Sequence, residues 1–211
     1  MPGLNTSKLS RDQLFDRLNE LENGSILVLS GSLPQGFPDD FYSQLMEKLA
    51  PKKLRIIVDT SGPALKSILN SKVTKPFMIK PNLHELKTFV GKELHQTEDI
   101  IDVAQKLIAS GIENIIVSLG SAGSLFISTE GVLHASPPTI QTESSVGAGD
   151  AMVAGLVAAV MDGLNLEATA KLATAFAVGK LGMHGPNLPT KETINSLANS
   201  VLISHINTVK S

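Results

Sequence analysis

The stretch RIIVDTSGPALKSILNSKVTKPFMIK, residues 55–80, predicts two buried β-strands joined by a short helix. The run Arg55–Asp59 is dominated by β-branched apolar residues, which are typical of a strand covered on both faces. Residues 63–70 predict the helix, and residues 76–80 predict the next strand. A strand–helix–strand succession of this kind indicates a parallel pair within an α/β fold.

The same alternation continues along the rest of the chain. The capping-box pair Ser10 and Gln13 predicts the start of a helix with Leu14, Leu18 and Leu21 on its apolar face. The other expected helices cover residues 39–50, a segment that Thr97 caps, and residues 149–162, 165–181 and 190–206. The other expected strands are 26–30, 113–119 and a hairpin of 124–128 with 132–135. We therefore expect one domain over residues 1–211, with a largely parallel central sheet in an α/β/α arrangement of three layers.

Composition narrows the class of protein. The sequence has 18 basic and 20 acidic side chains and a formal charge of −2, so it offers no electrostatic footprint for nucleic acid. It contains no cysteine, which excludes disulfides, thiolate metal sites and cysteine nucleophiles and is compatible with a cytoplasmic protein. Its longest apolar stretch, residues 151–161, is too short to span a bilayer, so we expect no membrane association.

Small, polar or charged residues follow each of the expected parallel strands. The four strand ends are Ser30-Gly31-Ser32, Asp59-Thr60-Ser61-Gly62, Lys80-Pro81-Asn82 and Ser118-Leu119-Gly120. Such residues are common in ordinary turns, and each loop taken alone has that explanation. However, ligands in α/β folds bind beyond the carboxyl ends of the strands, so four such ends together favour a polar ligand site.

The sharpest local feature is the turn Gly147-Ala148-Gly149-Asp150, which opens a helix of small residues. Glycines allow a tight turn and bring backbone N–H groups close to a ligand. The unpaired N–H groups of the first helical turn and the helix dipole then form an anion hole suited to a phosphoryl group. Asp150 could accept a proton from an attacking hydroxyl, or it could only complement the helix dipole.

Two common phosphate-binding patterns are absent from the sequence. No GxxxxGK[ST] segment occurs, and the glycine loop, HRD and DFG motifs of protein kinases are missing. The run Gly120-Ser121-Ala122-Gly123 lacks the GxGxxG spacing and predicts a tight loop between a strand and a hairpin.

Five ordered segments together resemble the PfkB (ribokinase-like) carbohydrate kinases. They are SGSLPQG at 30–36, VDTSG at 58–62, IKPNLHEL at 79–86, VSLGSAGSLF at 117–126 and SSVGAGDAMVAGL at 144–156. The combination is most similar to the branch that holds 1-phosphofructokinase and tagatose-6-phosphate kinase. The resemblance implies a ribokinase-like fold and ATP-dependent, Mg²⁺-assisted phosphorylation of a sugar phosphate.

The resemblance also implies roles for particular residues. Asp150 would be the general base, with the amides of Gly147, Ala148 and Gly149 as the anion hole. Asn82 and Glu85 match an NxxE element that organises Mg²⁺ through water, although a glutamate there could also be a solvated helix carboxylate. The positions that match the nucleotide side are Lys80, Ser118, Gly120, Ser121, Gly123 and, near the adenine, Asn187. Lys80 could instead be an exposed lysine at a strand end. Ser30, Gly31 and Ser32 would border the sugar.

The chain begins at a segment, Pro2–Ser7, that resembles a mid-protein part of this family. The family's first strands and β-rich lid, which recognise the sugar and shape a homodimer, have no counterpart in the sequence. We therefore expect either a kinase acting on fructose 1-phosphate, with tagatose 6-phosphate as the alternative, or a truncated nucleotide-binding module without catalysis. The exposed sheet edge that either fragment would leave predicts self-association.

Overall fold

The structure, a computed structural model, describes residues 8–140, 146–183, 187 and 189–207. The chain forms two compact units, Met1–Asn114 and Ile115–Ser211, which are described one at a time. The segment Pro2–Ser7 and Ser145 of the glycine-turn motif lie outside the described residues. The expectation of one domain over residues 1–211 stays a prediction.

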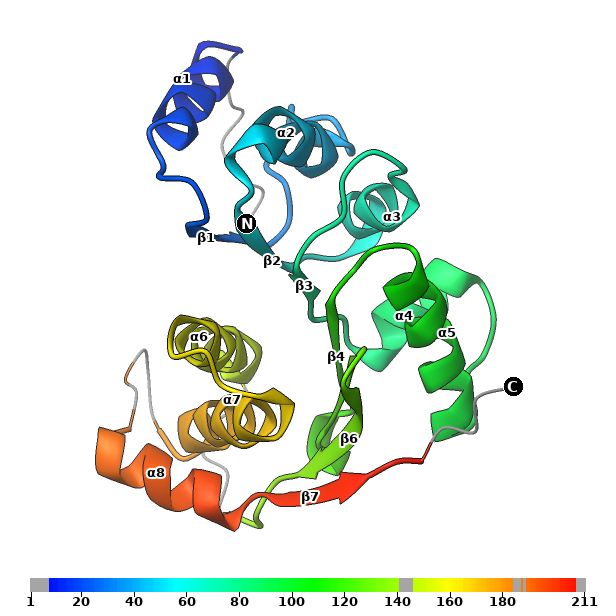
Figure 1. Cartoon of the computed structure of the whole chain (residues 1–211), viewed down its shortest axis with the longest axis vertical. Helices are drawn as coiled ribbons and strands as arrows, with labels where there is room; N and C mark the ends of the chain where they lie inside the picture. Colours follow the sequence, from blue (N-terminus) through cyan, green and yellow to red (C-terminus); the bar gives the residue numbers. More distant parts are fainter. Residues whose placement is uncertain (1–7, 141–145, 184–186, 188, 208–211) are drawn as a thin grey trace. The chain divides into compact units, whose positions relative to one another are not determined.

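Strands and helices alternate through most of the chain (Figure 1). The strands are β1 (Ile26–Ser30), β2 (Arg55–Asp59), β3 (Met78–Ile79), β4 (Asn114–Ser118), β5 (Ser124–Ser128), β6 (Gly131–Ser136) and β7 (Leu202–His205). The α-helices are α1 (Lys8–Asn19), α2 (Phe41–Leu49), α3 (Gly62–Asn70), α4 (Leu83–Val90), α5 (Thr97–Ala109), α6 (Ala148–Met161), α7 (Leu166–Leu181) and α8 (Lys191–Ser200). Short 3₁₀ turns cover Ala50–Lys52 and Gly120–Ala122. The predicted α/β class is confirmed.

The strands of the first unit run parallel, as predicted. β1 pairs with β2 from Ile26 opposite Arg55 to Ser30 opposite Asp59, and β2 pairs with β3. The bounds of β1 and β2 match the predicted strands. The apolar β-branched residues of β2 are buried, whereas Ile26 and Val28 of β1 are half-buried. β3 is shorter than the predicted 76–80, since Pro76 has no N–H for a ladder. The backbone N–H of Lys80 nevertheless donates to Val58 O at 3.0 Å.

Two helix starts in the first unit differ from the predictions. α1 begins at Lys8, so Ser10 lies inside the helix and the predicted capping box with Gln13 is wrong. α5 begins at Thr97 itself, and its N-cap is Gln96 rather than Thr97. Asp99 accepts hydrogen bonds from the backbone N–H groups of Gln96 and His95, which lower the pKa of its carboxyl.

The second unit contains the predicted hairpin and one unpredicted strand. β5 and β6 pair antiparallel with Ser128 opposite Gly131. The predicted helix over 190–206 is wrong beyond Ser200: the backbone becomes extended at Val201, and β7 pairs antiparallel with β6. The pairing with β6 provides hydrogen bonds for the backbone of β7, and the local sequence pattern contains no information about that partner. Hydrogen-bonded neighbours in this unit follow the chain order β4, β5, β6, β7.

Helices α6 and α7 of the second unit pack very closely. Gly155 of α6 lies so near α7 that an added Cβ would be 2.8 Å from the Cα of Ala173.

Among the described residues, no helix has both the length and the apolar character needed to cross a membrane.

Candidate active site

The loops after the parallel strands of the first unit are tied together by hydrogen bonds. Because β1, β2 and β3 are parallel, their carboxyl ends lie at the same edge of the sheet. Gly31, which has a φ of 85°, donates from its N–H to Asp59 O at 2.9 Å. The buried Thr60 hydroxyl donates to Gly31 O at 2.7 Å. The predicted gathering of polar loops at one edge is therefore present within this unit.

Tyr42 on α2 holds the segment that was expected to border the sugar. Its hydroxyl lies 3.3 Å from Ser30 O and 3.4 Å from Gly31 O. Burial raises the pKa of Tyr42, so the phenol remains a neutral donor. Ser30, Gly31 and Ser32 are themselves exposed, which leaves this segment open to a ligand.

Lys80 is buried, so the interpretation as an exposed strand-end lysine is wrong. Its Nζ forms an ion pair with Asp59 Oδ1 at 3.0 Å, and the two side chains keep only 8% and 17% of their exposure. The pair joins the end of β2 to the residue after β3. A positive charge is thus fixed at the edge of the sheet by a neighbouring carboxylate.

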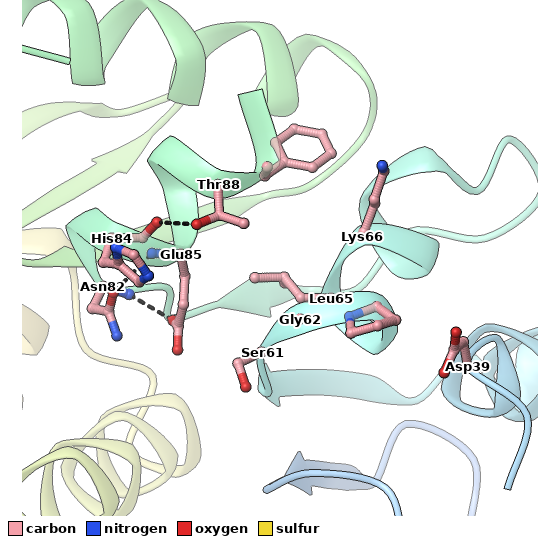
Figure 2. Close-up of a pocket in the computed structure, with 11 residues that line it drawn as sticks. Asp39, Ser61, Gly62, Leu65, Lys66, Asn82, His84, Glu85 and Thr88 are labelled. Atoms are coloured by element: carbon pink, nitrogen blue, oxygen red, sulfur yellow. Dashed lines mark hydrogen bonds between the residues drawn. The ribbon is translucent and has the colours of Figure 1, made fainter. Parts of the chain in front are cut away.

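Asn82 and Glu85 form a reciprocal capping box at the start of α4 (Figure 2). Asn82 Oδ1 accepts from Glu85 N–H at 2.9 Å, and Glu85 Oε2 accepts from Asn82 N–H at 2.9 Å. Glu85 is therefore more than a solvated helix carboxylate, since it has a definite structural role. Its other oxygen, Oε1, accepts no hydrogen bond from a described residue.

A pocket of about 740 Å³ opens between the first turns of α3 and α4. Figure 2 shows the side chains of Glu85 and Ser61 facing this opening, with Leu65 between the two helices. Asp39, Lys66, Asn82 and His84 also line it. The volume lies within the range of small-molecule sites.

The fit of Mg²⁺ to this part of the first unit follows from the available donors. Oxygen is the donor that Mg²⁺ prefers, and the ion usually keeps several waters and takes one or two carboxylates. Glu85 Oε1 offers such a carboxylate oxygen at the pocket. Among the described residues there is no cluster of three or more potential ligands from histidine, cysteine, aspartate or glutamate. The residues therefore fit a largely hydrated ion.

In the second unit, the loop after β4 is a tight turn, as expected. Leu119 N–H donates to Gly123 O at 2.8 Å, and Gly123 N–H donates to Gly120 O at 3.1 Å. A Cβ on Gly123, whose φ is 93°, would lie 2.1 Å from Ala135 O, so no other residue fits there. Ser118 is half-buried, whereas Gly120 and Ser121 are exposed.

The glycine turn places Asp150 in the first turn of α6. Gly147 is the N-cap in a left-handed conformation, with a φ of 82° and a ψ of 2°, and its carbonyl accepts from Ala151 N–H at 2.9 Å. Gly149 and Asp150 are exposed and Ala148 is half-exposed. The carboxylate of Asp150 makes no hydrogen bond or ion pair with another described residue. A hydrogen-bonded capping role for Asp150 therefore finds no support in the described part of the chain.

Asn187 is exposed, and its backbone carbonyl accepts a hydrogen bond from Lys180 Nζ at 3.4 Å. Lys180, on α7, is buried. Sequence reasoning missed Lys180 and Tyr42, and it identified Thr60 only as part of a polar strand end. Each acts on a backbone carbonyl of another segment, and such a contact leaves no local motif.

Comparison with known proteins identifies relatives over most of the chain. The family model described as pfkB family carbohydrate kinase matches residues 3–193. A protein named 1-phosphofructokinase from Xanthomonas campestris pv. campestris is 38% identical over 209 residues, which cover 98% of this chain and 66% of that protein. The ATP-dependent 6-phosphofructokinase isozyme 2 of Escherichia coli is 35% identical over 176 residues, covering 83% of this chain and 56% of that protein.

Solved structures show the same fold. The crystal structure of phosphofructokinase-2 from Escherichia coli in complex with fructose-6-phosphate matches with a TM-score of 0.86 and 31% identity, over 95% of this chain and 64% of that one. This chain thus spans between 56% and 66% of the length of these proteins.

Proposed function

The chain belongs to the pfkB family of carbohydrate kinases, and from this premise we propose that it is the catalytic, nucleotide-binding part of an ATP-dependent sugar-phosphate kinase. One observation carries the proposal: an exposed carboxylate without a described partner, Asp150, stands in the first turn of α6 directly after the left-handed turn at Gly147. A carboxylate there complements the helix dipole, but beside an anion hole it also repels phosphate, which disfavours it unless it takes part in the chemistry.

In the proposed reaction, Asp150 takes the proton from the acceptor hydroxyl of the sugar phosphate. The hydroxyl oxygen forms a bond to the γ-phosphorus of ATP, while the bond from that phosphorus to the oxygen bridging to the β-phosphate breaks and ADP leaves. The N–H groups at Gly147, Ala148 and Gly149 stabilise the charge on the transferring group.

We assign the other site residues to one unit at a time. In the second unit, Ser118, Gly120, Ser121, Gly123 and Asn187 contact the nucleotide. In the first unit, Lys80 binds phosphate, and Ser30, Gly31 and Ser32 border the sugar. Asn82 and Glu85 would hold hydrated Mg²⁺, which supplies neutralising charge to the phosphates when bound.

Fructose 1-phosphate is the proposed acceptor, because the relative from Xanthomonas campestris pv. campestris is named 1-phosphofructokinase. Tagatose 6-phosphate is the alternative, and fructose 6-phosphate is tested beside them because a further relative is named a 6-phosphofructokinase. We place the enzyme in the cytoplasm, where ATP is available, and expect a homodimer for the complete protein. The second candidate is a nucleotide-binding module without catalysis, since the chain spans about two thirds of its relatives.

The test measures ATP consumption by this chain with each sugar phosphate, beside the variant Asp150→Asn. We expect turnover to fall by at least about a hundredfold, because a general base contributes 10²–10⁴ in rate. Asp162→Asn is the matched control, because Asp162 is exposed at the other end of the same helix, and its turnover should be unchanged. Turnover that survives in Asp150→Asn contradicts the base. If neither protein turns over but ATP raises the melting temperature, the binding module is the correct function.

A further inference from the structure

A buried lysine lies against the glycine turn of the second unit. Lys180 is in the last turn of α7 and retains only 7% exposure. Burial of an ammonium group is costly, and lysine is among the residues least often buried. A buried ammonium group therefore requires polar partners, and their positions show which segments the side chain connects.

The side chain of Lys180 contacts the start of α6 directly. A Cβ built on Gly147 would lie 3.1 Å from Lys180 Cε and 4.0 Å from its Cγ, so the aliphatic stem runs along the turn. The ammonium at the end of that stem donates to Asn187 O at 3.4 Å. One side chain therefore connects the turn that precedes Asp150 with the loop that contains Asn187.

We propose that Lys180 is a positioning residue that holds the Gly147–Asp150 turn in place and, through its ammonium, favours a phosphate anion at the first turn of α6. This inference rests on the proposed function, since it concerns the same phosphate-binding turn. The positive charge of Lys180 adds to the partial positive charge of the helix N-terminus. Because Lys180 is buried, its attraction for an anion is screened less than that of a lysine on an open surface.

The usual role of a lysine in a last helical turn does not explain this placement. Such a lysine complements the dipole of its own helix and does so equally well from an exposed position. Lys180 instead lies against Gly147, whose φ of 82° favours glycine and where an added Cβ would lie 3.1 Å from Lys180 Cε. Glycine at 147 and lysine at 180 thus fit each other.

The experiment measures the binding of ATP and of adenosine to the 211-residue chain by titration calorimetry. Lys180→Met keeps the aliphatic stem and removes the charge, whereas Lys180→Arg keeps the charge. Lys171→Met is the matched control, because Lys171 is on the same helix but is part-exposed and paired with Glu167. The melting temperature without ligand shows whether each variant is folded. If Lys180→Met does not fold, Lys180→Gln takes its place.

We expect Lys180→Met to weaken ATP binding about tenfold more than adenosine binding, which is the effect of losing one charged partner. Lys180→Arg and Lys171→Met should keep the wild-type ratio of the two affinities. A merely structural lysine predicts an equal loss for both ligands, and that result, or no loss, overturns the inference. No ATP binding by the wild-type chain would overturn it as well.

The two proposals fail in different ways. Asp150→Asn should lower turnover by at least about a hundredfold. It should still bind ATP, because the change removes a negative charge near the phosphates. If Asp150→Asn remains active, the assignment of the base fails, while the ratio of ATP to adenosine binding still decides the role of Lys180.

Discussion

The ion pair with Asp59 limits the ability of the Lys80 ammonium to bind a phosphate. The side chains keep 8% and 17% of their exposure, so each charge depends on the other for compensation. The family resemblance implies that Lys80 lies on the nucleotide side, where it could bind phosphate. In the structure its charge is already shared with a carboxylate, and a nucleotide phosphate would have to compete with Asp59 for it.

Asp59→Asn should therefore lower the free energy of unfolding by about 3 kcal/mol, because it leaves the Lys80 ammonium buried without its counter-charge. The double variant Asp59→Asn/Lys80→Met should recover part of that loss. Chemical denaturation of the wild type, the two single variants and the double variant gives the coupling between the residues. Glu93→Gln, which removes an exposed partner of Lys87, is the control and should have little effect. Additive losses for Asp59 and Lys80 would contradict the coupling.

At the scale of whole elements, the close packing of helices α6 and α7 restricts residue 155 to glycine. The close approach at Gly155 brings the helix that carries Asp150 against the helix that carries Lys180. Helix propensity alone predicts that alanine at 155 stabilises the chain by about 1 kcal/mol. The contact predicts the opposite, since the new Cβ would lie 2.8 Å from Ala173 Cα and 3.1 Å from the Cβ of Phe176.

We expect Gly155→Ala to lower the free energy of unfolding by about 1–3 kcal/mol, because the two backbones must move apart. Ala154→Ser, at the exposed neighbouring position of the same helix, should change it by less than about 0.5 kcal/mol. Equilibrium unfolding in urea measures both. A stabilising effect of Gly155→Ala would mean that the helices pack less closely than the structure shows.

Elements with a local signal were predictable from the sequence, whereas those that depend on a distant partner were not. β1 and β2 have the predicted bounds because apolar runs encode them. β7 depends on its pairing with β6, and no local pattern contains that information. The same division holds for the candidate site: the turn at Gly147–Asp150 has its own motif. Tyr42 and Thr60 act on carbonyls of segments distant in the sequence. The capping box of Asn82 and Glu85 was a local signal for α4, but Glu85 was interpreted as part of a metal-binding element or as a solvated helix carboxylate.

At the scale of the whole molecule, one edge of β1 has no neighbouring strand in the described part of the chain. β1 pairs with β2 along its other edge. Its apolar residues Ile26, Leu27 and Val28 are only half-buried. An unpaired strand of this composition is a template for pairing with another chain.

We therefore expect the isolated chain to self-associate, so that its apparent mass by size-exclusion chromatography with light scattering exceeds 22.3 kDa and rises with concentration. Ile26→Lys should shift the equilibrium towards the monomer, because a charge on an edge strand opposes edge-to-edge pairing. Val73→Lys is the control, since Val73 is 76% exposed and lies outside the strands. It should leave the association unchanged, whereas an effect of net charge alone would reduce the association in both variants. A wild-type chain that stays monomeric and unfolds cooperatively at high concentration would show that β1 needs no partner. The part of the relatives that this chain does not match would then be unnecessary for a stable fold of these residues.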